Sequence, residues 1–454
     1  AQQTPKLNRF PTSKSNLTHD GEPYLQGQVL RQSQLGNTLE RIALYGRDEF
    51  YEGETTRELV KAVQEAGGIF SEQDFKEHSS VLYEDPLCVT YRGHQIFTTS
   101  PPSQGIIVLE MLNILEGFPI ANSGWGSSES IHWMVEAKKI AYGDRLANLG
   151  DPTFINFPVE NLLSKDYGEK RRKEIGLNSV IKESDPTQFE SIQKDSTSYF
   201  CVADRFGNLV SFIHSISNHM GSGFIAGNTG ILLNNRVGRG FYLQEGPNQL
   251  APQKRTMNTI QSYMVLKDGK PWIVGGTPGG DAQSQWNVQV LTGMIDFDLN
   301  PQQAADAPRW TSYPGTDPSS IGDAQVVTLE PGFPDTTYKN LQASGHVIER
   351  IELGQSLGGV QLIQINQEAQ QEKERSSGMK NDRPTPKGKI AIGLQPMAFQ
   401  GGSVKIRRRS YSLPPRLGTE GKRKFNPLTI SIEAPIINPI HIHGDLKNLP
   451  LGYV

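Results

Sequence analysis

The sequence has little cysteine, no long apolar run and no large excess of charge of either sign. Its 454 residues include only two cysteines, Cys88 and Cys201, which excludes a disulfide framework. Both lie in apolar, strand-like runs, so we expect two buried free thiols, with one disulfide as the alternative. No stretch approaches the length of a membrane-spanning helix, and no membrane span is predicted. The first residues lack the apolar core of a signal peptide, so localisation is not readable from them.

The formal net charge of -3 hides two regions of opposite sign. Of the 45 basic and 48 acidic residues, 15 and 7 fall in residues 366–454, which leaves 30 and 41 in residues 1–365. A mildly acidic body argues against nucleic acid as a partner, because such binding needs a basic surface. The basic end is polar and rich in proline, and we interpret residues 366–454 as a low-order tail.

Hydrophobic patterns divide the body into an earlier, mostly helical part and a later part richer in strands. The predicted helices cover residues 35–46, 56–67, 71–78, 106–118, 130–150, 282–297 and 300–310. The predicted strands cover residues 87–93, 94–99, 199–204, 208–216, 230–235, 262–269 and 271–276. Between the two parts, residues 165–196 are strongly charged, and we predict a flexible connector. The fold class is therefore α/β, with a connector directly in front of a strand.

The connector ends at Ser196 and Thr197. A threonine at a chain end is a special nucleophile, because its own α-amine serves as the general base for its hydroxyl. Such chemistry needs cleavage that exposes the threonine, a strand that holds it and backbone N–H donors for the oxyanion. Residues 195–236 supply the first two. The GGTPGGD run at residues 275–281 supplies a glycine pair in front of a helix, where N–H groups converge on an anion.

From about Phe10 to Ile365 the chain resembles the γ-glutamyltransferase family of N-terminal-nucleophile hydrolases. The shared motifs, in matching order and spacing, are EFYEGE, AGGIFS, TTSPPSQG, LEMLNILEGF, EAKKIAYGDR, VENLLSK, TSYFCVADRFGN, GSGFIAGNTGILLNN, KR and GGTPGGD. The resemblance implies a four-layer αββα sandwich that uses no cofactor and no metal. It also implies cleavage into two pieces that remain together as a heterodimer. These are residues 1–196 and a smaller piece whose catalytic segment covers residues 197–365.

The resemblance assigns catalytic roles to four residues. Thr197 becomes the nucleophile, and the bond between Ser196 and Thr197 becomes the cleavage site. Ser215 falls where the family has a hydroxyl that orients the nucleophile. Gly279 and Gly280 fall on the glycines of the oxyanion hole. The alternative for Ser215 is a serine whose side chain satisfies a strand edge. The alternative for Gly279 and Gly280 is a tight strand-to-helix turn.

The substrate-binding positions depart from the family pattern. NNRVGRGF replaces NNQMDDF, so Arg236 and Arg239 stand where the family has a glutamine and the acid that holds the substrate's α-amine. Asn258 and Thr259 replace a serine pair that contacts the α-carboxylate, and Ser217 replaces an asparagine. Two guanidinium groups favour an anionic group over an ammonium group. The alternative is that both arginines are solvated loop residues.

The resemblance predicts an amide hydrolase or acyltransferase that acts on γ-glutamyl compounds such as glutathione. The two arginines favour an alternative, an acylase of another acid amide of the oxamate or cephalosporin type. The family's amino-terminal third has no counterpart in the sequence, so we expect the sandwich to lack strands unless another chain supplies them. An inactive remnant or interaction protein is therefore a third alternative.

Two features of the tail suggest weaker candidate sites. His441 and His443 could place two imidazoles on one face of a strand as metal ligands. Lys405 and residues 407–409 could contact phosphate or a membrane surface, although a solvated run is the favoured interpretation.

Overall fold

The structure is a computed structural model, and it describes most of the chain up to residue 366. The described residues are 1–156, 158–176, 179–181, 195–204, 207–318, 320, 322–352, 358–366 and 390–394. The helices are α1 (Thr4–Leu7), α2 (Pro11–Leu17), α3 (Ser33–Tyr45), α4 (Arg47–Tyr51), α5 (Glu54–Glu65), α6 (Glu72–Lys76), α7 (Gly105–Leu115), α8 (Ile120–Ser123), α9 (Ser128–Asn148), α10 (Val159–Leu162), α11 (Lys165–Arg172), α12 (Val237–Gly240), α13 (Ala282–Ile295), α14 (Pro301–Asp306) and α15 (Asp335–Ala343). The strands are β1 (Leu87–Tyr91), β2 (His94–Thr98), β3 (Asp195–Ala203), β4 (Leu209–Asn218), β5 (Tyr263–Lys267), β6 (Lys270–Gly276), β7 (Trp310–Tyr313), β8 (Val326–Leu329), β9 (Ile348–Arg350), β10 (Gln361–Ile365) and β11 (Ile390–Leu394).

A six-stranded sheet with the order β1-β2-β5-β6-β10-β11 forms the centre of the molecule. All neighbouring strands in it are antiparallel. Asp268 and Gly269, which connect β5 to β6, both have positive φ, as a tight two-residue hairpin requires. Four of the five β5 residues are buried, which indicates that the sheet is covered on both faces.

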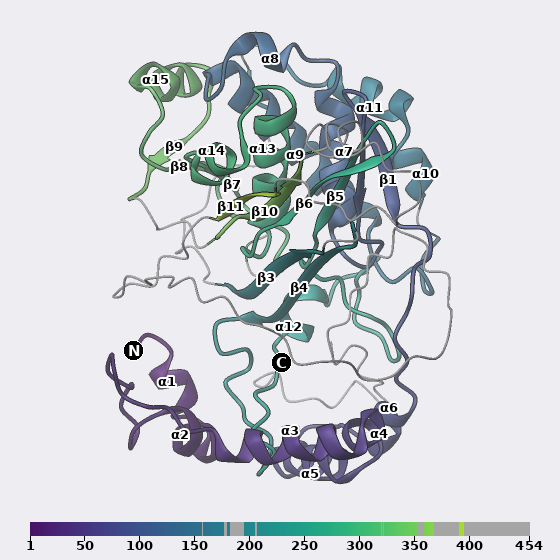
Figure 1. The fold of residues 1–454 in the computed structure, drawn as a ribbon, viewed down its shortest axis with the longest axis vertical. Coiled ribbons are helices and arrows are strands. Elements are labelled where there is room, and N and C mark those ends of the chain that lie inside the picture. The colour runs from purple at the N-terminus through teal and green to yellow at the C-terminus, as the bar shows by residue number, and fades with distance from the viewer. Residues whose placement is uncertain are drawn as a thin grey trace, which may run out of the picture.

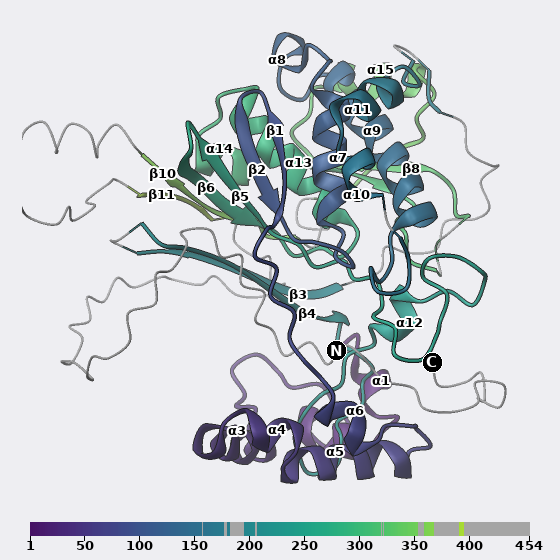
Figure 2. The ribbon, with the colours of Figure 1, turned by 90° about the vertical axis from the view of Figure 1, so that its right-hand side faces the viewer.

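Helices α7, α9 and α13 cover one face of this sheet (Figure 2). Every residue of α7 is buried, because its run of apolar side chains lies between the sheet and the other two helices. The residues of these helices form the largest hydrophobic cluster, which also includes Val265 and Ile273 of the sheet. The predicted apolar helices at residues 106–118, 130–150 and 282–297 are thereby confirmed.

The second face of the sheet packs against the antiparallel pair β3–β4 (Figure 2). Tyr199 of β3 and Ile213 of β4 point into this contact and are buried. The outer face of the pair exposes Phe200, Val202 and Val210. The described residues therefore form a helical layer, a six-stranded sheet and a two-stranded sheet. A further helical layer over β3–β4 remains a prediction.

A third sheet, in the order β7-β8-β9, lies beside this core. Strands β7 and β8 are antiparallel, and β8 pairs in parallel with β9. No helix in the described ranges is both long enough and apolar enough to cross a bilayer.

A helical lobe, residues 1–76 with helices α1 to α6, lies beyond β3–β4 and away from the central sheet (Figures 1 and 2). Its own small core includes Leu59, Val60 and Phe75, and Ala226 from the later part of the chain completes it. The helix predicted at residues 35–46 is confirmed as part of α3. Its apolar residues Leu39 and Leu44 are nevertheless exposed.

The predicted connector at residues 165–196 is wrong in its first part, because residues 165–172 form helix α11. Ser164 caps this helix by accepting a hydrogen bond from the Tyr167 amide. Its charged side chains have partners in the body: Arg172 Nε donates to the Ile114 carbonyl at 2.7 Å, and Lys165 Nζ donates to Asn113 Oδ1 at 2.7 Å. These contacts anchor α11 to the body, while Lys165, Asp166, Glu169 and Lys170 remain exposed to solvent.

Two further expectations need correction. Both cysteines are free thiols, as expected, but Cys88 is exposed and Cys201 is half-buried. Cys88 lies on edge strand β1, whose outward-facing positions are not covered. Five residues of the predicted low-order tail, Ile390–Leu394, pair with β10 as strand β11. The candidate residues 405, 407–409, 441 and 443 lie outside the described residues.

Candidate active site

Thr197 lies near the start of β3, directly opposite Ser215 of β4. The register of the pair shifts between Asp195 and Thr197, so the backbone is irregular at the predicted cleavage bond. The Thr197 hydroxyl donates to Ser215 Oγ at 3.0 Å. The Ser217 amide donates to the same oxygen at 2.9 Å, which fixes the Ser215 side chain in turn. The two predicted partners, Thr197 and Ser215, are thus in direct contact.

Two predicted substrate-binding residues carry buried polar atoms that no described residue satisfies. Ser217 is almost fully buried, has a φ of 74° and has no partner for Oγ among the described residues. Asn258 Oδ1 likewise has no hydrogen-bond partner in the described part of the chain. Buried polar atoms are usually paired, and strained backbone is concentrated at functional sites. These two atoms are therefore candidates for contact with a ligand.

A glycine turn, residues 277–281, leads from β6 into α13. Gly279 and Gly280 have φ values of 138° and 52°, which favour glycine. A Cβ at Gly279 would also strike the Trp286 indole. Their carbonyls accept from the Ala282 and Gln283 amides, but neither glycine amide donates to another described residue. Two N–H donors are therefore uncommitted in front of a helix, as an oxyanion site requires.

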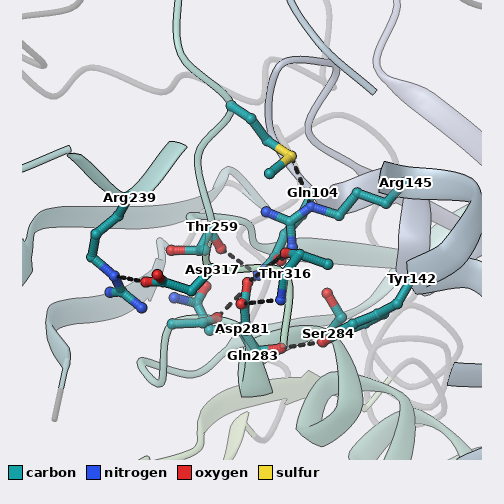
Figure 3. A network of polar contacts seen from close by, with 12 residues as sticks. Gln104, Tyr142, Arg145, Arg239, Thr259, Asp281, Gln283, Ser284, Thr316 and Asp317 are labelled. Atoms are coloured by element: carbon teal, nitrogen blue, oxygen red, sulfur yellow. Dashed lines mark hydrogen bonds and ion pairs between the residues drawn. The ribbon is translucent and has the colours of Figure 1, made fainter. Parts of the chain in front are cut away.

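A buried polar network surrounds the glycine turn (Figure 3). Asp281 Oδ1 accepts from Arg145 Nη1 at 2.9 Å, and Asp281 Oδ2 accepts from the Thr316 amide at 2.6 Å. Burial by itself raises the pKa of Asp281. The Arg145 and Arg239 guanidinium groups and the Thr316 amide outweigh it and hold the pKa below its ordinary value. Asp281 is therefore a carboxylate that is fully engaged within the protein.

Arg236 is buried, and Arg239 is of intermediate burial with a side chain that is 9% exposed, so the interpretation of them as solvated loop residues is wrong. Arg236 Nη1 donates to Thr259 Oγ1 at 3.2 Å, which joins two predicted substrate-binding residues. Arg239 forms a buried ion pair with Asp317 (Figure 3). Asp317 opposes the charge of Arg239, which weakens the case for Arg239 as the group that binds an anionic substrate.

Sequence reasoning missed Gln104, Arg145, Asp281 and Asp317. The first three lie in the quoted motifs TTSPPSQG, EAKKIAYGDR and GGTPGGD, so their positions were visible but their contacts were not. Asp317 is 78 residues from Arg239, and no local pattern indicates their pairing.

One group of three potential metal ligands occurs within the described ranges: His132, Glu136 and His346, all buried. Lys139 Nζ lies 2.7 Å from Glu136 Oε1 and neutralises this carboxylate. His132 Nδ1 and His346 Nε2 are 2.8 Å apart and share a hydrogen bond. The group is thus balanced in charge without an ion, and adding a divalent cation beside the ammonium group of Lys139 would be costly.

Comparison with known proteins places these features in a family context. The family model for gamma-glutamyltranspeptidase matches residues 1–385. A glutathione hydrolase-like proenzyme of Bacillus subtilis (strain 168) is 37% identical over 371 residues, covering 80% of this chain and 67% of that protein. The glutathione hydrolase proenzyme of Escherichia coli (strain K12) is 32% identical over 373 residues, covering 79% of this chain and 62% of that protein.

A solved structure is also similar. The crystal structure of cephalosporin acylase from Bacillus halodurans has a TM-score of 0.71 and 30% identity, covering 85% of this chain and 64% of that one. The chain thus spans about 62% of the length of the Escherichia coli relative and matches hydrolases and an acylase alike.

Proposed function

The chain belongs to the gamma-glutamyltranspeptidase family, and we propose that it is an amide hydrolase that is cleaved before Thr197 and then uses Thr197 as its nucleophile. The contact between Thr197 Oγ1 and Ser215 Oγ, at 3.0 Å, is the observation that carries this proposal. It holds the nucleophilic oxygen in a fixed direction on a rigid strand, which lowers the entropic cost of attack.

The proposed chemistry has two stages. Cleavage adds one water to the amide between Ser196 and Thr197, which yields a carboxylate on Ser196 and a free α-amine on Thr197. That amine then accepts the hydroxyl proton as Thr197 Oγ attacks the substrate's amide carbon. The amides of Gly279 and Gly280 stabilise the resulting oxyanion. The leaving amine departs with a proton, and water or another amine releases the acyl group.

The first test of this function concerns the nucleophile. Thr197→Ala removes the attacking oxygen, so the protein should remain one 454-residue chain and should hydrolyse no amide. Ser198→Ala, which removes the neighbouring hydroxyl, is the matched control and should give two fragments. A Thr197→Ala protein that still splits at this bond contradicts the proposal. A wild-type protein that stays uncleaved after long incubation favours the inactive remnant instead.

We place the substrate among amides of acids that bear a carboxylate and no neighbouring ammonium group. Arg236 and Thr259 form a buried pair of donors at positions where the sequence departs from the family pattern, and a guanidinium group suits a carboxylate. Similarity to the cephalosporin acylase supports an acyl group other than γ-glutamyl. The γ-glutamyl compounds predicted by the family resemblance are the competing substrates.

The test compares a glutaryl anilide with the matching γ-glutamyl anilide. We expect the wild-type protein to have the higher kcat/KM for the glutaryl compound. Arg236→Gln should reduce that preference by roughly ten- to a hundredfold, the usual value of a lost charged contact in a pocket. Arg57→Gln makes the same chemical change on the exposed surface of α5 and should leave the preference unaltered. A strong wild-type preference for the γ-glutamyl compound contradicts this assignment.

A further inference from the structure

Arg145, near the end of α9, connects segments of the proposed active site that are far apart in the sequence (Figure 3). The side chain is buried. Its Nη1 donates to Gln104 Oε1 at 2.6 Å and to Asp281 Oδ1 at 2.9 Å, and its Nε donates to Met257 Sδ at 2.9 Å. One guanidinium group therefore holds the start of α7, the glycine turn and the segment that precedes Asn258.

Two of these partners, Gln104 and Asp281, transmit this restraint to other residues of the proposed site. Gln104 Nε2 donates to the Gly280 carbonyl at 3.0 Å and to the Thr259 carbonyl at 2.7 Å. Gln104 thus joins the proposed oxyanion turn to a proposed substrate-binding residue. Asp281 accepts from Thr316, the neighbour of Asp317, and Asp317 pairs with Arg239.

The glycine turn needs such support because of its composition. Two adjacent glycines have the greatest backbone freedom of any residue pair, while oxyanion donors must be placed accurately. A displacement of about 1 Å in an active site costs roughly a hundredfold in rate. The guanidinium fork is planar and rigid, so it sets direction as well as charge, whereas a lysine ammonium supplies only a point charge.

From these contacts we infer that Arg145 is a positioning residue, which fixes the Gly279 and Gly280 amides relative to Asn258 and Thr259. It acts through Gln104 and Asp281 and does not itself contact the substrate. The expected effect of Arg145 on kcat rests on the proposed function, whereas its restraint of the glycine turn does not.

The kinetic test uses Arg145→Lys and Arg145→Met. The concentration of active sites is first titrated with an inhibitor that reacts covalently with Thr197, and each rate is divided by that concentration. We expect kcat to fall by roughly a hundredfold in both variants, with KM changed by less than about threefold. Arg92→Lys and Arg92→Met are the matched controls, because Arg92 also pairs with a buried acid, Asp296, at 3.1 Å but at the β1–β2 turn. A merely structural role would lower the titrated fraction and leave kcat per titrated site unchanged, and this result overturns the inference.

A second readout does not depend on activity. The backbone amides of Thr277 and of residues 279–283 should exchange hydrogen faster in Arg145→Lys than in the wild-type protein, and Arg92→Lys should leave them unchanged. Equal exchange in the two variants overturns the inference. If the wild-type protein cleaves no amide and Thr197 is not titrated, the proposed function fails, while the exchange comparison still decides the role of Arg145.

Discussion

Helix α9 carries two buried ionic clusters that differ in kind. The imidazole cluster is made of His132, Glu136 and Lys139 of α9 together with His346, which follows α15. It holds two residues that follow α11: His132 Nε2 donates to the Gly176 carbonyl at 2.8 Å, and Glu136 Oε2 accepts from the Ile181 amide at 2.7 Å. The guanidinium cluster, made of Arg145, Gln104 and Asp281, lies at the later end and holds the glycine turn.

The two clusters respond differently to pH. A guanidinium group keeps its charge at every accessible pH, whereas an imidazole changes charge near neutrality unless its surroundings prevent it. Burial, together with the neighbouring Lys139 and His132, lowers the pKa of His346 to about 3. Helix α9 therefore combines a pH-sensitive anchor for Gly176 and Ile181 with a pH-insensitive anchor for the glycine turn.

The largest expected effect follows from breaking the imidazole cluster. Glu136→Leu leaves the buried Lys139 ammonium without its carboxylate, which should lower the free energy of unfolding by about 3–5 kcal/mol. Urea denaturation monitored by fluorescence measures this change. Glu129→Leu, at an exposed position of the same helix, is the control and should change the value by less than about 0.5 kcal/mol. Equal losses in the two variants would show that Glu136 does not stabilise the protein through Lys139.

The next effect concerns the turn held by the other cluster. Gly280→Val places a branched side chain at a φ of 52° beside the proposed oxyanion donors and should reduce kcat by about 10²- to 10³-fold. Gly269→Val introduces comparable backbone strain in the β5–β6 turn, where a side chain meets open space. This control should lose stability and keep its kcat per titrated site. If Gly269→Val loses the same catalytic rate, general strain explains both results.

The smallest effect is a pH dependence of the free energy of unfolding that arises from the imidazole cluster. The folded-state pKa of His346 lies below its unfolded value of about 6.5, so between these values only the unfolded state binds the proton. Stability is therefore complete above about pH 6.5 and falls as the pH falls toward 3, by at most about 1.4 kcal/mol per pH unit.

Unfolding experiments at pH 7, 6 and 5 should show this slope in the wild-type protein and a shallower one in His346→Gln. Identical slopes exclude His346 as the source. The hydrogen exchange of the Ile181 amide, divided by its intrinsic rate, should be faster at pH 5 than at pH 7. The same ratio for the amides of residues 281–283 should not rise, because the pKa of Asp281 is held below its ordinary value.

The sequence predicted the regular elements well where their apolar pattern was long. The helix at residues 282–297 and the strands at residues 262–276 were identified because burial dictates their periodicity. Helix α11 was missed because its stability comes from the Ser164 cap and contacts with Asn113 and Ile114, not from an apolar stripe.

The site was predictable only in part. Motif resemblance suggested the pairing of Thr197 with Ser215, which the strand register then brings into contact. It gave no sign that Asp317 opposes Arg239, or that Arg145 reaches Gln104 and Asp281, because such contacts depend on the assembled fold. The charge of Arg239 in the sequence therefore does not give the net charge at its position in the fold, where Asp317 opposes it.

The helical lobe has a consequence for biosynthesis. Lys6 Nζ donates to the His219 and Gly221 carbonyls, which follow it by 213 and 215 residues. Thr12 and Thr38 donate to the Ile225 and Thr229 carbonyls across similar distances. At translation rates of 5–20 residues per second, a ribosome needs roughly 10–40 s to deliver these partners. During that interval the lobe lacks the segment that completes its core, so we expect its core to stay incompletely covered until the later residues emerge.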